Sequence, residues 1–247
     1  MVVPGSAITR YGKVLPVNID VIAHIHTDFP QKFGVPRQSG LVPELEARIV
    51  FESAYALPDA VRGIEGFSHI WLIWGFEDTE REGGWSPTVR PPRLGGRKRM
   101  GVFATRSPFR PNPLGLSSVE LAGVEYVDGA PVLHVRGADL RDGTPIYDIK
   151  PYLAYTDSHA DACGGFADDV LRDQESCPMA VAFPENLLNM VPSEKREALL
   201  AVLRQDPRPA FSRDASRAYS MAFGQLDVSF VVDDGAHMLE VVGVRPR

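Results

Sequence analysis

The sequence predicts a mainly β N-terminal domain followed by a small α+β domain, and three observations support this prediction. Glycine and proline together make up 43 of 247 residues, a larger share than the roughly 12% that is usual. Short apolar stretches with a period of two recur between these turn-forming residues, as is typical of strands. One clear helix is expected, at Pro192 to Arg204, where a single apolar stripe follows a proline start.

The first domain is expected to contain seven short strands. Asp128-Gly129 provides the two-residue turn of a hairpin between two of them. The stretch Ser68 to Phe76 is apolar at both odd and even positions, which predicts either burial of both faces or a place in a closed sheet. The expected strands are Val17–Thr27, Ala47–Phe51, Ser68–Phe76, Met100–Arg106, Ser117–Tyr126, Pro131–Arg136 and Ile146–Lys150, with one helical turn at Pro58–Arg62.

The second half of the chain has a different composition. The domain boundaries that follow are 15–157 for the first domain, 158–180 for a linker rich in Asp, Ala and Gly, and 181–247 for the second domain. After the helix, the pattern predicts the strands Tyr219–Phe223, Leu226–Val232 and Met238–Val244, the last two joined by a turn at Asp234-Gly235.

Composition excludes several classes of protein. The formal net charge of −6 argues against a polybasic protein, and the longest apolar run, Ile70 to Trp74, is far shorter than the roughly 20 residues of a membrane span. No signal peptide is visible at the N-terminus, so a soluble, cytoplasmic protein is expected. Cys163 and Cys177 are too few for a disulfide scaffold, and neither lies in a motif that would activate a thiol.

One segment reverses the acidic balance. Between Arg81 and Asn112 there are eight basic residues and one acidic residue, and seven of the eight are arginines, which suit phosphate groups. An acidic chain with one basic segment is expected to attract a polyanion at that place, and nucleic acid fits best. The alternative is a solvated loop balanced by a nearby acidic face.

Three further segments are stiffened by proline or glycine and carry polar side chains. These are Phe33–Gln38, Thr105–Gly115 and Asp139–Pro145. Each could shape a ligand site, although such turns usually only connect strands.

Other familiar sites are missing. No G-x-G-x-x-G lies between a strand and a helix, so a Rossmann domain is not supported, and no P-loop, H-E-x-x-H or G-x-S-x-G motif occurs. His24 and His26 share one strand face, but no third ligand completes a metal set, so no metal is expected. Trp71 and Trp74 are expected in the core, whereas Trp85 in the basic segment is the better candidate for stacking on bases.

Taken together, these motifs resemble the TsaA/YaeB-like family, the TrmO tRNA methyltransferases. The resemblance covers about Ile19 to Tyr155, and Asp206–Phe211 resembles the family's C-terminal motif. The segments that carry it are Phe33–Gln38, Gly66–Trp71, Pro87–Gly96, Met100–Gly115 and Asp142–Tyr152.

The resemblance implies a single-sheet antiparallel β-barrel that is not a Rossmann domain, a homodimer, and a pocket for S-adenosyl-L-methionine near the dimer interface. The implied reaction is methylation of N6 of threonylcarbamoyladenosine at tRNA position 37, chiefly in threonine tRNA. Carried over by position, the cofactor contacts are Pro36, Arg37, Gln38, Glu77, Asp78, Arg106, Leu116, Asp142, Gly143, Thr144 and Pro145. Glu77 and Asp78 replace the His and polar residue that family members often carry there.

The acceptor N6 must lose a proton around the time of methyl transfer, and Asp142 and Asp139 are the candidate bases. Capping of a turn is the alternative role for both carboxylates. Positioning of the reacting atoms is expected to contribute as much as a base, or more. The residues expected to bind RNA are Arg90, Arg93, Arg97, Lys98, Arg99, Arg110 and Arg208.

Two alternatives to the methyltransferase remain at this point. One is a regulatory module on the same barrel that binds S-adenosylmethionine or RNA without turnover. The other is a methyltransferase for small molecules, which the basic segment disfavours.

Overall fold

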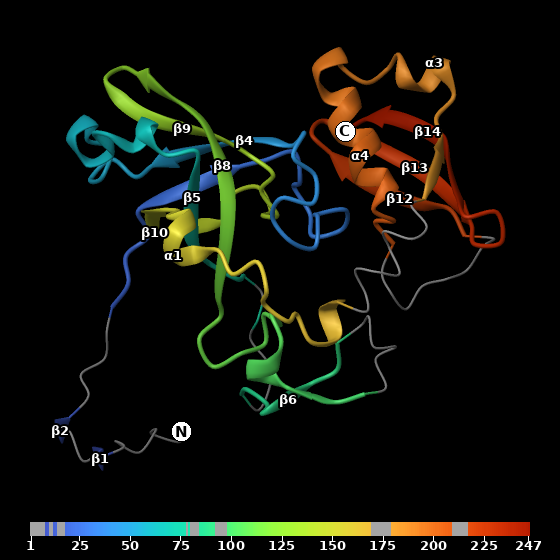
Figure 1. Ribbon diagram of the computed structural model, residues 1–247. Coiled ribbons are helices and arrows are strands. Elements are labelled where there is room, and N and C mark those ends of the chain that lie inside the picture. Colours follow the sequence, from blue (N-terminus) through green and yellow to red (C-terminus); the bar gives the residue numbers. More distant parts are fainter. Residues whose placement is uncertain are drawn as a thin grey trace.

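The computed structural model describes residues 18–77, 79, 84–91, 98–168, 179–208 and 217–247, together with the two-residue strands β1 (Ile8–Thr9) and β2 (Gly12–Lys13). In these ranges the chain forms one large antiparallel sheet, one smaller, mixed sheet and two two-stranded sheets (Figure 1). No helix within them combines the length and the apolar character that a membrane crossing requires.

The large sheet contains six strands, each paired with two neighbours. In the order β10-β3-β4-β9-β8-β5, every pair is antiparallel, and β5 pairs back to β10, so the sheet forms a closed barrel. The prediction of a mainly β, antiparallel N-terminal region is confirmed. The strands are β3 (Ala23–His26), β4 (Glu46–Phe51), β5 (His69–Gly75), β8 (Leu114–Val127), β9 (Ala130–Arg136) and β10 (Pro145–Pro151).

Alternate residues of these strands fill the interior of the closed sheet. Ile25, Ile49, Leu72 and Leu133 are completely buried, as the period of two requires. The outward face of β5 is only half-buried. Trp71 lies on this face, and its Nε1 donates a hydrogen bond to Asp157 Oδ2 at 2.9 Å. Of the two alternatives predicted for this stretch, a place in a closed sheet is correct, whereas burial of both faces is only partly correct.

The strand expected at Met100–Arg106 is replaced by two short elements. β7 (Met100–Gly101) pairs with β6 (Thr88–Val89), and the chain then turns through a 3₁₀ turn at Val102–Ala104. The Thr105 hydroxyl donates to the Val102 carbonyl at 2.9 Å and closes this turn. Such a local hydrogen bond competes with strand pairing, and the apolar pattern does not reveal it.

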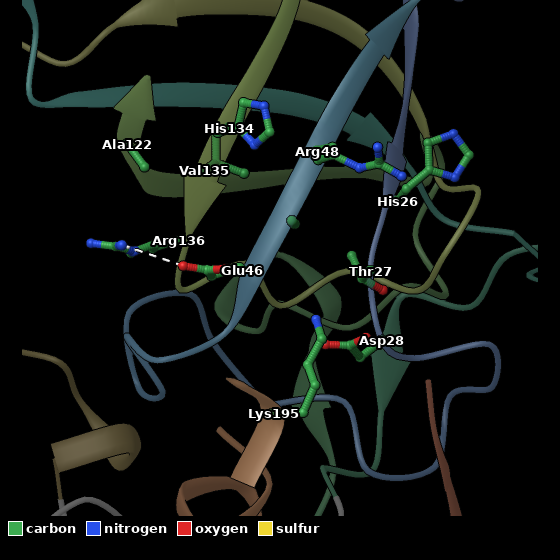
Figure 2. A pocket seen from close by; sticks show the side chains of 11 residues that line it. His26, Thr27, Asp28, Glu46, Arg48, Ala122, His134, Val135, Arg136 and Lys195 are labelled. Carbon is green, nitrogen blue, oxygen red and sulfur yellow. Dashed lines mark hydrogen bonds and ion pairs between the residues drawn. The ribbon is translucent and has the colours of Figure 1, made fainter. Parts of the chain in front are cut away.

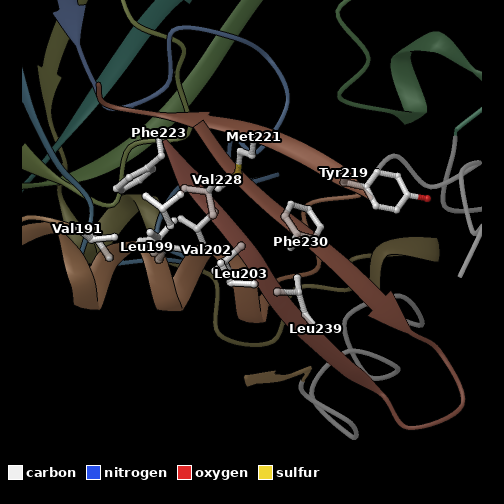
Figure 3. Close-up of a cluster of buried hydrophobic side chains, with 14 of the residues drawn as sticks. Val191, Leu199, Val202, Leu203, Tyr219, Met221, Phe223, Val228, Phe230 and Leu239 are labelled. Carbon is white, nitrogen blue, oxygen red and sulfur yellow. The ribbon is translucent and has the colours of Figure 1, made fainter. Parts of the chain in front are cut away.

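The C-terminal sheet has the order β11-β14-β13-β12 and is covered by α4 (Figure 3). α4 (Arg196–Arg204) is shorter than the expected helix, because a 3₁₀ turn at Ser193–Lys195 precedes it. The parallel pairing of β11 with β14 was not expected. The remaining elements are α1 (Ala154–Asp157), β11 (Ala180–Ala182), α3 (Glu185–Leu188), β12 (Tyr219–Phe223), β13 (Leu226–Asp233) and β14 (Met238–Pro246).

The connection between β3 and β4 leaves the closed sheet and packs into the C-terminal core (Figure 1). Phe29, Val42 and Leu45 are almost fully buried there. The Phe29 ring meets Phe223 of β12 edge to face, with centroids 5.6 Å apart. Residues of the expected first domain thus complete the core of the second.

Polar contacts fix the same junction. The backbone N–H of Gly224 donates to the Asp28 carbonyl at 2.7 Å, and Lys195 Nζ pairs with Asp28 Oδ2 at 2.7 Å. Gly34 has a φ of +96°, and a Cβ there would lie 2.1 Å from Met221 Sδ. A side chain at position 34 would therefore strain the backbone and displace Met221.

The junction predicts a large effect of Phe29→Ala. Removal of this ring leaves a cavity in the shared core, and the free energy of unfolding should fall by about 3–5 kcal/mol. Urea denaturation measures the change. Phe103→Ala is the matched control, because that ring is 74% exposed and its loss should cost less than about 0.5 kcal/mol. Equal effects of the two substitutions would contradict the packing described here.

Candidate active site

Three segments that lie far apart in the sequence meet at one end of the closed sheet. Arg106 Nη1 donates to Gln38 Oε1. This hydrogen bond joins the β3–β4 connection to the segment that follows the 3₁₀ turn at Val102–Ala104. The backbone N–H of Ser39 donates to the Asp139 carboxylate, and Arg106 interacts electrostatically with the same group. The expected candidates Gln38, Arg106 and Asp139 therefore lie together, and we call them, with Ser39 and Ser117, the Asp139 cluster.

Asp139 is the half-buried acid of this cluster. Its Oδ1 accepts a hydrogen bond of 2.6 Å from Ser117 Oγ, which itself accepts one of 3.0 Å from Trp74 Nε1. Burial raises the pKa of Asp139 above its usual value. The Ser117 hydroxyl, the backbone N–H groups of Asp139 and Ser39, and the Arg106 charge act in the opposite direction. The result is a desolvated carboxylate with increased affinity for a proton.

The pairing of β5 with β8 places the partners of Asp139. Ser117 is 1% exposed and lies on the inward face of β8. Gly115, two residues earlier on that face, lies against the indole of Trp74, where a Cβ would come within 2.2 Å of the ring. Only glycine at position 115 leaves the space that Trp74 needs to reach Ser117.

The second candidate base, Asp142, lies in the turn before β10. Its Oδ1 accepts from the Thr27 backbone N–H at 3.1 Å and contacts His26 Nδ1 at 3.2 Å. Its own N–H donates to the Phe29 carbonyl at 2.8 Å. Asp142 therefore attaches this turn to the end of β3, and its side chain is 42% exposed.

The other expected contacts of this turn form a neighbouring group. Gly143 has a φ of +79°, and the buried Thr144 donates its hydroxyl to the Arg141 carbonyl at 2.7 Å, immediately before Pro145 begins β10. The Glu77 carboxylate forms an ion pair with Arg141. This pair brings the end of β5 to the turn, whereas Asp78 lies outside the described residues.

Not all the expected cofactor contacts face the Asp139 cluster. Pro36 is buried, and Arg37 Nη2 donates to the Asp206 carbonyl at 3.0 Å, toward the C-terminal region. Burial lowers the pKa of Arg37, and Asp206 partly offsets this. Leu116 lies on the outward face of β8 and is 55% exposed.

The residues expected to bind RNA differ in their exposure. Arg90, Lys98 and Arg99 are exposed, while Arg93 and Arg97 lie outside the described residues. Arg110 is half-buried, and its Nη1 donates to the Thr105 carbonyl at 2.9 Å, so it supports its own loop.

Arg208 requires a correction. It is 5% exposed and forms ion pairs with Asp206 at 2.8 Å and Asp234 at 2.7 Å. The Asp206 hydrogen bond is the main cause that raises its pKa, although burial acts to lower it. A buried guanidinium held by two carboxylates is not presented to RNA, so its role is structural.

The structure places two exposed aromatic rings of the basic segment next to each other, and only Trp85 was singled out from the sequence. Trp85 is 54% exposed, Phe103 is 74% exposed, and their ring centroids lie 6.3 Å apart. Phe103 was missed, because an expected strand at Met100–Arg106 gave no reason to single it out. Its place in the basic segment was the one available signal.

The two histidines of β3 each pair with a carboxylate. His24 lies 2.9 Å from Glu52, and His26 lies 3.2 Å from Asp142. Within the described ranges, no group of three His, Cys, Asp or Glu side chains is arranged to hold a metal ion.

Comparisons with known proteins match both halves of the chain. The tRNA-methyltransferase O N-terminal domain family matches residues 24–158, and the TrmO C-terminal domain family matches residues 176–247. The tRNA (adenine(37)-N6)-methyltransferase of Escherichia coli K12 is 42% identical over 234 residues, which cover 92% of this chain and 97% of the relative.

Two comparisons with Pseudomonas aeruginosa proteins extend this result. A relative named "Putative S-adenosylmethionine-dependent methyltransferase RcsF" is 36% identical over 92% of this chain and 98% of its own length. The crystal structure of TrmO from this organism superposes with a TM-score of 0.75 at 30% identity, over 95% of this chain and 99% of that one. The matches to both domain families and the identity across nearly the whole E. coli relative show that the chain belongs to the TrmO family.

Proposed function

We propose that this chain is a tRNA methyltransferase that uses S-adenosylmethionine to methylate N6 of adenosine 37. We further propose that the nucleoside that accepts the methyl group is threonylcarbamoyladenosine, chiefly in threonine tRNA. The observation that carries the proposal is the Asp139 cluster, formed by three distant segments in a chain whose E. coli relative is a tRNA (adenine(37)-N6)-methyltransferase.

The chemistry of the cluster fits the cofactor. S-adenosylmethionine supplies a methyl group bonded to a positively charged sulfur. A desolvated carboxylate such as Asp139 favours a cation nearby, and the Arg106 guanidinium suits the carboxylate of a methionine group. Gln38 and the turn from Asp142 to Pro145 would hold the remaining polar atoms.

Asp139 is the stronger candidate for the base. The raised pKa increases its affinity for the proton that N6 must release, and a base of this kind contributes about 10²–10⁴-fold. Asp142, with its Oδ1 already bound to Thr27 and His26, would position the turn. Most of the remaining rate would come from alignment of the reacting atoms.

The exposed part of the basic segment would form the RNA surface. Arg90, Lys98 and Arg99 would contact phosphates, and Trp85 with Phe103 would stack on bases that leave the loop. The proposal includes a homodimer, because Leu114 and Leu116 expose apolar side chains on the outward face of β8 beside the site.

The reaction itself is tested with labelled cofactor. Threonine tRNA carrying the threonylcarbamoyl group should accept the methyl label from the wild-type protein, and the same tRNA without that group should not. Transfer to both RNAs would contradict the proposal that threonylcarbamoyladenosine is the methyl acceptor. Retention of the cofactor without transfer to either would indicate a binding module instead.

Asp139→Asn separates catalysis from stability. We expect the transfer rate to fall about 10²–10⁴-fold, because asparagine cannot accept the proton. The wild-type protein loses stability as pH rises through the raised pKa of Asp139, whereas asparagine does not ionise. The variant should therefore have a higher Tm at neutral pH, and this advantage should vanish in acid.

Measurements of rate and Tm against pH check both expectations. Asp148→Asn is the control, because this carboxylate is half-buried on β10 and pairs with Lys150 at 2.8 Å. An Asp139→Asn variant with the wild-type rate would exclude Asp139 as the base.

Phe103→Ala tests the stacking surface. Loss of one stacked base should weaken tRNA binding by about 5- to 150-fold and leave its salt dependence unchanged, because no phosphate contact is removed. Fluorescence anisotropy with labelled tRNA at several salt concentrations measures both quantities. Tyr155→Ala is the matched control, since this ring is 87% exposed and lies outside the basic segment. Unchanged affinity in the Phe103 variant would place the RNA elsewhere.

A further inference from the structure

A row of basic side chains crosses three strands on the outer face of the closed sheet. His26 of β3 lies opposite Arg48 of β4, and Arg48 lies opposite His134 of β9. All three point outward, because their neighbours Ile25, Ile49 and Leu133 fill the interior. The row lines a cleft of about 520 Å³, which also reaches Lys195, the residue just before α4 (Figure 2).

The other charges of this cleft are already paired. Lys195 holds Asp28 at 2.7 Å, and Arg136 holds Glu46 at 3.3 Å. Arg48 differs from them: among the residues that the structure describes, no carboxylate lies within 4.0 Å of its guanidinium. Figure 2 shows the Arg48 side chain extending across the face of the sheet toward His26.

Each histidine of the row is held by a carboxylate. His26 Nδ1 lies 3.2 Å from Asp142 Oδ1, and His134 Nε2 lies 2.8 Å from Glu125 Oε2. One ring nitrogen of each histidine is thereby engaged, and the other nitrogen remains to contact a ligand in the cleft.

Arg48 lies between the two imidazoles, and an anion bound there would give its guanidinium a charged partner. Arg48 offers a planar fork of donors, and the imidazoles flank it, which suits the oxygens of a phosphate group. We propose that this cleft binds a backbone phosphate of the substrate RNA, with Arg48 as its central contact.

The position of the row supports RNA as the source of the phosphate. Because His26 contacts Asp142, the row begins at the turn that we assign to the cofactor and continues away from it across β3, β4 and β9. An RNA whose base enters the candidate site would have backbone phosphates along this path. The inference thus rests on the proposed function and extends its RNA surface beyond the basic segment.

Arg48→Gln tests the inference in the full-length protein. The probe is threonine tRNA, with affinity measured at several salt concentrations and methyl transfer measured at low and saturating tRNA. We expect binding to weaken about tenfold and the salt slope to fall by about 0.7–0.9, the value of one phosphate contact. KM for tRNA should rise while kcat at saturating tRNA stays unchanged. Arg245→Gln is the matched control, because this exposed arginine of β14 does not line the cleft.

Two outcomes would overturn the inference. One is a salt slope and KM in Arg48→Gln equal to those of the wild type, while the wild type methylates tRNA normally. The other is a shift of the His26 and His134 NMR signals by inorganic phosphate with no change in the RNA slope, because the site would then serve free phosphate. Failure of the proposed function has a different signature, since the wild-type protein itself would not methylate tRNA.

Discussion

The insertion of the β3–β4 connection into the C-terminal core is the constraint on which the rest of the structure depends. One side of this connection supplies Phe29, Val42 and Leu45 to a hydrophobic core that the C-terminal region cannot complete alone. The other side supplies Gln38 and Ser39 to the Asp139 cluster. Because burial of the first set holds the backbone, the polar atoms of the second set are fixed without a loss of conformational freedom on binding. The C-terminal region therefore contributes to the candidate site without lining it.

Asp139 shows the cost of such a site. A half-buried carboxylate at the end of a closed sheet loses much of its hydration, and Ser117 with two backbone N–H groups compensates only partly, as the raised pKa indicates. A protein selected for stability alone would place an amide or an apolar residue there. The retention of a desolvated acid beside an arginine is typical of functional sites, where local stability is given up for chemistry.

The sequence predicted the parts of the fold that local patterns control. β4, β9, β12 and β13 follow from alternation and turn residues, and the apolar stripe located α4. Predictions failed where distant residues decide the outcome. Nothing local indicates that Asp234 would bury Arg208, or that the segment after Gly101 would form a 3₁₀ turn. In the candidate site, loops and a family resemblance singled out Gln38, Arg106 and Asp139, which the structure brings together and whose roles stay predictions. The Arg48 row depends on strand register, which no single segment encodes.

β14 is the last strand in chain order, yet it lies inside its sheet, between β13 and β11. During synthesis on the ribosome, residues 238–246 emerge after all the segments that they hold together. The C-terminal core, and with it the anchorage of Phe29, has to wait for them. The nascent chain can thus close its first sheet early, whereas the β3–β4 connection gains its anchor in the C-terminal core only after residues 238–246 have emerged.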